Sequence, residues 1–145
     1  MTDTEQFHVA FVCVQNAGRS QMSTAFAEQA VAERGLDGRV TVHTGGTDPA
    51  DHVHEEVVTV MDELGIDLAD REPREIPTAE LNDCHLVVTM GCSTLSLDTD
   101  VEVRDWALDD PDGQDLDAVR AIRDDIRERI DGVFDDIEAR LESAA

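Results

Sequence analysis

Apolar runs of strand length alternate along this chain with longer stretches of helical periodicity. Runs rich in Val, Leu and Thr predict four β-strands, over residues 8–13, 40–44, 86–90 and 101–106. Apolar residues at helical spacing predict three helices, over residues 19–34, 54–64 and 116–141. Gly35 and Gly65 follow the first two helices and are expected to close them. Strands that alternate with helices form a parallel sheet covered on both faces, so the pattern predicts an α/β fold.

The last predicted helix carries a continuous apolar stripe. Its members are Leu116, Val119, Ile122, Ile126, Ile130, Val133, Ile137 and Leu141. We expect this face in the core and the Asp, Glu and Arg side chains of the helix in water. No linker or repeat divides the chain, and 145 residues are enough for one core but not for two. The sequence therefore predicts a single domain over residues 1–145.

The composition is strongly acidic. The formal net charge is −23, and the 11 basic side chains are all arginines. Nucleic acid is excluded as a partner, because a phosphate backbone attracts the opposite charge. At 1 M salt the Debye length is roughly 3 Å, and an acidic surface no longer repels anions from a distance. We therefore expect a salt-rich, halophile-like cytosol; an acidic surface that only aids solubility is the alternative.

Residues 1–5 lack the regions of a secretion signal, and no apolar segment approaches the ~20 residues that span a bilayer. We expect a cytoplasmic monomer with no membrane partner. The three cysteines are an odd number for a disulfide framework in a reducing compartment. Catalysis or redox exchange by these thiols therefore remains open.

Candidate chemistry is concentrated where the first strand meets the first helix. Cys13 ends the strand, and Arg19 and Ser20 open the helix. Sulfur is nucleophilic as the thiolate, which a helix N-terminus and a guanidinium stabilise, and to which Ser20 can donate a hydrogen bond. Loop amides and a bidentate guanidinium can bind an oxyanion, through Val14, Gln15, Asn16, Ala17, Gly18 and Arg19. This segment predicts attack by sulfur on a tetrahedral oxyanion.

A purely structural, buried Cys13 is the alternative. We favour the nucleophile because the carboxyl ends of parallel strands bring other reactive groups to the same edge. Cys92 follows the third strand and is a candidate thiol to resolve a Cys13 intermediate. The alternative is that Cys92 is only a partly buried thiol in a loop. Asp110 follows the fourth strand and precedes Pro111, so it is a candidate general acid, with an Asp-Pro turn as the alternative. Cys84 lies at the other end of the third strand, where packing is its expected role.

Five segments in this order resemble the low-molecular-weight tyrosine phosphatase superfamily, and more narrowly its arsenate reductase branch. They are residues 13–20, 44–49, 65–68, 87–92 and 106–111. The resemblance implies a three-layer α/β sandwich with a four-stranded parallel sheet. It implies that Cys13 is the nucleophile, that Arg19 and the loop amides hold arsenate, and that Asp110 is the acid. It further implies that Ser20 stabilises the thiolate and that Asn16 shapes the loop.

In the reductase branch a second cysteine attacks the thiol–arsenate adduct and releases arsenite. Cys92 matches that position, and no cysteine stands at residues 94–96, where many members carry a third. We expect no bound cofactor and no metal, and a thioredoxin-like protein or a low-molecular-weight thiol as reductant. Arsenate reduction is the predicted function. A phosphatase acting through a phosphocysteine is the alternative function, although the chain has no Tyr to flank a substrate ring. A non-catalytic oxyanion-binding module is the third hypothesis.

Overall fold

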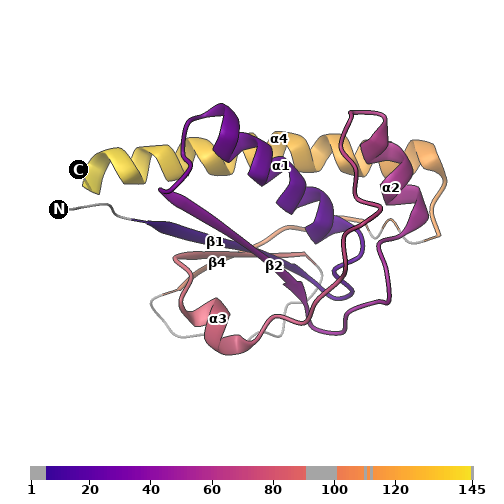
Figure 1. Cartoon of the computed structure of the whole chain (residues 1–145), viewed down its shortest axis with the longest axis horizontal. Coiled ribbons are helices and arrows are strands. Elements are labelled where there is room, and N and C mark those ends of the chain that lie inside the picture. The colour runs from indigo at the N-terminus through magenta and orange to yellow at the C-terminus, as the bar shows by residue number, and fades with distance from the viewer. Residues whose placement is uncertain (1–5, 91–100, 110, 112, 145) are drawn as a thin grey trace.

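The computed structural model describes residues 6–90, 101–109, 111 and 113–144, and a parallel β-sheet forms their centre (Figure 1). Within these residues the strands are β1 (Phe7–Cys13), β2 (Val40–Gly46), β3 (Leu86–Met90) and β4 (Glu102–Asp105). They lie in the order β2-β1-β3-β4, and each neighbouring pair is parallel. Cys13 pairs with Gly46 on one side and with Met90 on the other. The end of β1 therefore lies at the centre of the edge where ligands bind in parallel sheets.

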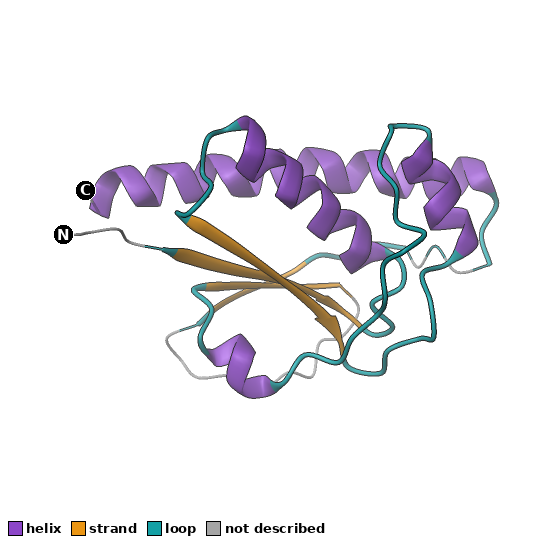
Figure 2. Cartoon of the chain, viewed as in Figure 1, coloured by secondary structure: helices purple, strands orange, loops and turns teal. Residues whose placement is uncertain are grey.

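Helices cover both faces of the sheet. They are α1 (Arg19–Glu33), α2 (Glu55–Asp62), α3 (Thr78–Asn82) and α4 (Leu116–Ala144). The short α3 lies on one face, and the other three helices lie on the opposite face (Figure 2). Alternate residues of a strand point to opposite faces, so Val9 and Phe11 join the large core beneath α1 and α4, whereas Ala10 and Val12 join a smaller cluster with Leu81 of α3. The predicted three-layer sandwich is confirmed.

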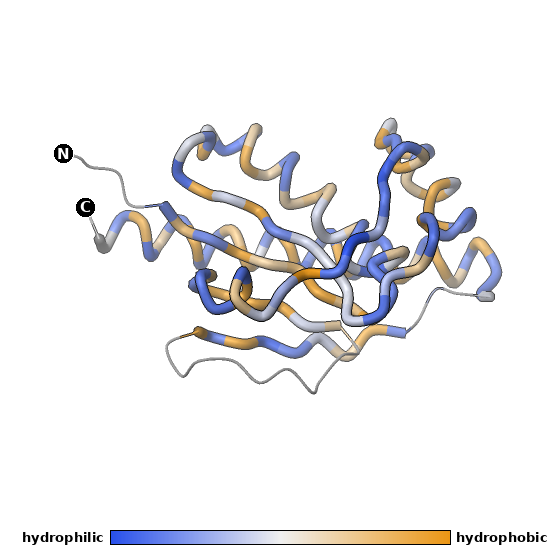
Figure 3. The backbone as a smooth tube through the Cα atoms, turned by 60° about the horizontal axis from the view of Figure 1, so that its bottom comes forward, coloured by the Kyte–Doolittle hydropathy of each residue, from blue (hydrophilic) through white to orange (hydrophobic). Residues whose placement is uncertain are grey.

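The long helix α4 buries nearly all of its predicted stripe. Hydrophobic and hydrophilic residues alternate along it (Figure 3). The buried members are Val119, Ile122, Ile126, Ile130, Val133, Ile137 and Leu141. The prediction was wrong for Leu116, which is 37% exposed because the first turn of α4 lies beyond the ends of the strands (Figure 1). None of the described helices has both the length and the apolar character needed to cross a membrane.

The sequence located most elements but not all of their ends. Gly35 and Gly65 follow α1 and α2 with φ angles of 67° and 76°, as expected of residues that close helices. The second helix is shorter than the predicted 54–64, and β2 continues past the predicted 40–44 to Gly46. Helix α3 was not predicted, because its 5 residues are too few to show a helical period.

Salt is expected to stabilise this fold. At a net charge of −23 the excess acidic side chains repel one another in the folded state. Salt ions screen that repulsion. Screening also weakens surface ion pairs, such as Arg34 with Asp135 and Glu138, but each such pair contributes only about 0–1 kcal/mol. We expect the Tm in calorimetry to rise by roughly 10 °C between low salt and molar KCl, which corresponds to a few kcal/mol. A Tm that falls with KCl, or that rises equally with glycerol at matched osmolality, would contradict this prediction.

Candidate active site

Cys13 lies at the base of a loop formed by residues 13–19, which we call the anion loop. Its sulfur is 2.9 Å from Ser20 Oγ, and it accepts a hydrogen bond from the Asn16 amide at 3.2 Å. Cys13 is 2% exposed, and Asn16 and Ser20 are fully buried. The sulfur is therefore withdrawn from bulk water and is surrounded by hydrogen-bond donors.

Asn16 also contacts the hydroxyl of Ser20. The Asn16 Nδ2 group can only donate, and it donates to Ser20 Oγ at 2.7 Å. A hydroxyl has a second lone pair as well as its own proton, so in the Cys13–Ser20 contact either atom can be the donor. Ser20 and the Asn16 amide thus both lie within hydrogen-bond distance of the sulfur, which is where a donor to a sulfur nucleophile is needed.

The carbonyl groups of the anion loop point outward. They accept hydrogen bonds of 2.8–3.2 Å from the amides of residues 47–54, in the pairs Cys13–Thr47, Val14–Asp48, Gln15–Ala50 and Ala17–His54. In a planar trans peptide the C=O group and the next N–H group point in opposite directions. The amides of residues 14, 15, 16 and 18 therefore face the interior of the loop, where that of Asn16 meets the sulfur. A ring of inward donors above a thiol has the geometry needed to hold an oxyanion.

Asn16 fixes the shape of the loop. Its φ angle is 52°, in the left-handed region that Asn tolerates better than most residues. Its Nδ2 donates to Ser20 and to Thr44, and its Oδ1 accepts from Gln21 Nε2 at 3.1 Å and from the Arg74 amide at 3.0 Å. The sequence identified Asn16 but none of these partners except Ser20. Thr44 and Arg74 are 28 and 58 residues away along the chain, so no local pattern reveals them.

Arg19 adds positive charge to the rim of the loop. It begins α1, and its Nη1 donates to the Leu108 carbonyl oxygen at 3.2 Å, which ties the guanidinium to the segment after β4. A helix N-terminus carries a partial positive charge. The first turn of α1 has no acidic residue, although the chain has 34 Asp and Glu residues. The start of α1 thus offers an oxyanion positive charge with no acidic side chain in the first helical turn.

Gly18 packs against the segment that contains Asp110 in the sequence. A Cβ atom on Gly18 would lie 2.8 Å from Pro111 Cγ and 3.4 Å from His54 Cδ2. The segment after β4 therefore reaches the anion loop, as the convergence of strand ends predicts. Asp110 and Cys92 themselves lie outside the described residues, so their roles stay predictions. Gly18 is the N-cap of α1, and Arg19 and Ser20 begin the helix as predicted.

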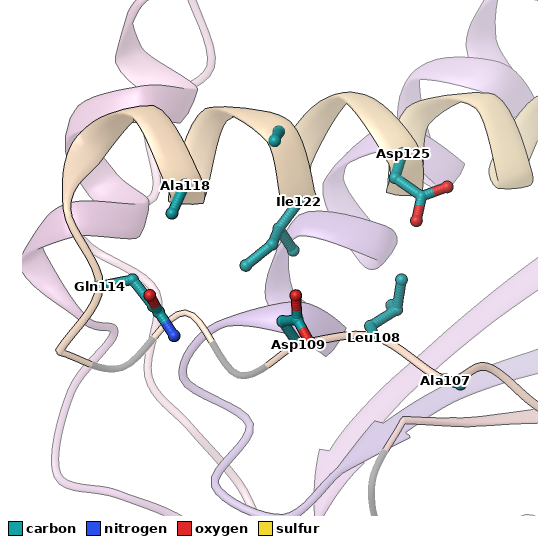
Figure 4. A pocket seen from close by; sticks show the side chains of 8 residues that line it. Ala107, Leu108, Asp109, Gln114, Ala118, Ile122 and Asp125 are labelled. Carbon is teal, nitrogen blue, oxygen red and sulfur yellow. The ribbon is translucent and has the colours of Figure 1, made fainter.

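A hollow of about 390 Å³ lies beside this site, between the segment after β4 and helix α4 (Figure 4). Its walls are formed by Ala107, Leu108, Asp109, Gln114, Ala118, Ala121, Ile122 and Asp125. None of these lining residues belongs to the anion loop, and the carboxylates of Asp109 and Asp125 disfavour an anion there. Within the described part of the chain, the anion loop itself is the better candidate for the substrate site.

Gly46→Ala is expected to distort the anion loop. The added Cβ would lie 2.5 Å from Val14 O and 3.0 Å from Asn16 N, and backbone atoms cannot rotate away. We expect the affinity for inorganic phosphate, measured by calorimetry, to fall by about 10- to 100-fold, the scale on which small displacements act in anchored sites. Gly132→Ala on α4 is the control, since nothing lies within 4 Å of its added Cβ. Equal phosphate affinity in both variants would contradict the prediction.

The sequence and the fold are both similar to those of known proteins. The family model of "Low molecular weight phosphotyrosine protein phosphatase" matches residues 8–143. A Halobacterium salinarum protein named "Putative arsenate reductase" is 65% identical over 127 residues, which cover 87% of this chain and 89% of that protein.

Two solved structures share the fold. The Corynebacterium glutamicum thioredoxin-dependent arsenate reductase has a TM-score of 0.79 at 26% identity; the match covers 96% of this chain and 65% of that longer chain. A structure described as an arsenate reductase in the phosphate binding state has a TM-score of 0.76 at 29% identity. That match covers 91% of this chain and 99% of the other.

Proposed function

This chain belongs to the low molecular weight phosphotyrosine protein phosphatase family, and we propose that it is an enzyme that reduces arsenate to arsenite through a Cys13–arsenate adduct. The observation that carries the proposal is the sulfur of Cys13 beneath a ring of inward amides, with the Asn16 amide donating to it and Ser20 Oγ 2.9 Å from it. The name of the relative that is 65% identical supports arsenate as the oxyanion. A relative of the same fold in a phosphate binding state supports a tetrahedral anion in this loop.

In the first step the Cys13 thiolate attacks arsenic(V). The S–As bond forms as one As–O bond breaks, and the departing oxygen leaves as water after taking a proton from Asp110, the proposed general acid. The inward amides and Arg19 hold the remaining oxygens and the negative charge on them. Ser20, whose hydroxyl lies 2.9 Å from the sulfur, is the proposed hydrogen-bond donor to it.

In the second step a thiolate attacks the sulfur of Cys13. An S–S bond forms, and the electron pair of the S–As bond leaves with arsenic, which departs as arsenite, arsenic(III). Cys92 is the proposed intramolecular thiol, since it stands two residues after Met90, the partner of Cys13 in β3; a small thiol is the alternative. A thioredoxin-like dithiol or a small thiol then reduces the disulfide. A thioredoxin-dependent relative supports the former, and we propose the reducing cytoplasm as the setting.

Cys84 is expected to take no part in turnover. It is buried on the α3 side of the sheet, where its thiol contacts the Glu80 carbonyl oxygen. Burial, with the nearby Glu80 and Asp83 carboxylates, raises the pKa of Cys84 to about 11, so the thiolate is scarce at neutral pH. Arsenite formation by Cys84→Ser should stay within about twofold of the parent. A large loss of rate in a variant with unchanged circular dichroism would give Cys84 a role.

Phosphate-ester hydrolysis is the second activity of this family that the site could support. A phosphotyrosine site is expected to place aromatic side chains around the substrate ring. Here Phe7, Phe11, Phe26, Phe134 and Trp106 are all buried in the core, and the chain has no Tyr. This distribution favours a small inorganic oxyanion over an aromatic ester.

The proposal is tested by incubating the protein with arsenate and either a thioredoxin system or a small thiol. We expect arsenite to form, and p-nitrophenyl phosphate to be hydrolysed slowly. Cys92→Ala should stop arsenite formation with the thioredoxin system and leave the phosphatase side reaction intact. Efficient hydrolysis of p-nitrophenyl phosphate without arsenite formation would overturn the reductase in favour of a phosphatase. Undiminished arsenite formation by Cys92→Ala would remove Cys92 from the mechanism.

A further inference from the structure

We infer that Arg74 is a positioning residue for the anion loop and that Glu80 holds it in place. The inference rests on the proposed function of that loop, and it concerns side chains outside the loop. Arg74 follows α2 in the chain and lies beside the end of β2, and Glu80 lies on α3. Neither is expected to touch the oxyanion, so their influence must pass through other residues.

Arg74 connects the end of β2 to the side chain of Asn16. Its amide donates to Asn16 Oδ1 at 3.0 Å, and its carbonyl oxygen accepts from the Gly46 amide at 2.9 Å. Its Nη1 donates to the Thr44 carbonyl oxygen at 2.8 Å. The hydroxyl of the same Thr44 accepts from Asn16 Nδ2 at 2.9 Å. Thus Arg74 fixes one partner of Asn16 through its side chain and supplies another from its backbone.

Glu80 fixes the guanidinium in this position. Its carboxylate accepts from Arg74 Nη1 at 3.2 Å and from Nη2 at 2.9 Å, a two-point pair that sets the plane of the guanidinium. His43 Nδ1 lies 2.9 Å from the same carboxylate. The Arg74 hydrogen bonds, followed by that of His43, lower the pKa of Glu80, and Glu80 raises the pKa of Arg74. The pair therefore remains charged across the neutral pH range.

The position of this pair explains why it is more than a surface ion pair. The Arg74 side chain is 46% exposed, and pairs this exposed contribute little to folding stability. Its hydrogen-bond neighbours, however, form a chain that leads through Asn16 to Ser20 and from Ser20 to Cys13. Asn16 holds a positive φ, which costs energy unless its side chain is anchored. Loss of the guanidinium should loosen that anchor and disorder the ring of amides.

The test is the affinity of Arg74→Gln for inorganic phosphate, measured by calorimetry under conditions in which circular dichroism shows a folded protein. We expect the Kd to rise about tenfold, which is the coupling typical of residues in one network. Arg34→Gln is the matched control. Arg34 also bonds carboxylate oxygens and a backbone carbonyl oxygen, although its carboxylates belong to two residues, and it follows the other end of α1. The Arg34 side chain is 21% exposed, so Arg34→Gln should lower the Tm at least as much as Arg74→Gln does.

Two further variants make the test specific. Glu80→Gln should weaken phosphate binding in the same direction, and the double variant should be no weaker than Arg74→Gln, because both changes break one connection. Arg74→Lys should recover only part of the affinity, since these bonds are made from two separate nitrogens of a planar guanidinium and a lysine has one nitrogen. Phosphate affinity equal to that of Arg34→Gln, or fully additive losses in the double variant, would overturn the inference.

The phosphate measurement separates this inference from the proposed function. A tenfold loss of phosphate affinity in Arg74→Gln supports the positioning role even in a protein that forms no arsenite, in which case only the reductase proposal fails. Normal arsenite formation with unchanged phosphate affinity in Arg74→Gln leaves the reductase intact and overturns the role of Arg74.

Discussion

Cys13→Ser is expected to abolish arsenite formation while the protein still binds phosphate. A serine hydroxyl is nearly un-ionised at neutral pH, so its oxygen is a much weaker nucleophile than the sulfur it replaces. The amide ring and Arg19 are untouched, so the anion site remains. Loss of a nucleophile from a catalytic unit typically lowers kcat by about 10⁴-fold or more. We therefore expect arsenite at the level of the uncatalysed reaction with any reductant.

Arsenite release is measured in single-turnover and steady-state assays, with phosphate affinity measured on the same preparations. Cys84→Ser is the control, because it makes the same atomic change at a buried thiol on the other side of the sheet. Arsenite formation by Cys13→Ser above one part in about 10⁴ would point to another nucleophile. If phosphate binding is lost as well, Cys13→Ala, which adds no polar atom beneath the anion, distinguishes a collapsed loop from a missing nucleophile.

Local sequence pattern was enough to predict where Cys13 and its loop lie in the fold. Cys13, Arg19 and Ser20 lie within eight consecutive residues, so their placement between a strand and a helix can be predicted from that short segment alone. In the structure β1 ends at Cys13 and α1 begins at Arg19, as expected. Asn16 was predictable for the same reason, because its side chain tolerates the left-handed backbone that the turn needs.

The support of the loop was not predictable in this way. Arg74 and Thr44 reach Asn16 from distant parts of the chain, and they contribute one backbone amide and one hydroxyl, for which no residue pattern is required. Helix α3 was not predicted because its 5 residues are too few for a repeating apolar pattern, and only its Leu81 packs into the smaller core cluster. Leu116 fitted the stripe of α4 but is 37% exposed, since periodicity gives the face of a helix and not the extent of the surface that covers it.

Arg19→Lys is expected to lower kcat/KM for arsenate by about 10²- to 10³-fold, the scale of losing one preorganised donor to a transition-state oxyanion. The substitution keeps the positive charge but replaces a planar fork of separate nitrogens by a single nitrogen, which cannot match the parallel bonds to two oxygens from the place where it also reaches the Leu108 carbonyl oxygen. Because the charge is conserved, the loss should be nearly the same at low and high KCl. Arg19→Gln removes the charge from a protein of net charge −23, so its loss should be larger at low salt, where screening is weak.

The two substitutions therefore separate the geometry of Arg19 from its charge. Both are measured as kcat/KM for arsenate across KCl concentrations at which the parent stays folded, with Arg39→Lys as an exposed control outside the site. If Arg19→Lys retains the parental kcat/KM, charge alone is sufficient and the bidentate contact is not used. If the Arg19→Lys loss shrinks with salt as steeply as that of Arg19→Gln, the long-range field decides arsenate capture. A salt-independent loss in Arg19→Lys would mean that the fixed guanidinium acts in contact with the anion, where screening by mobile ions has little effect.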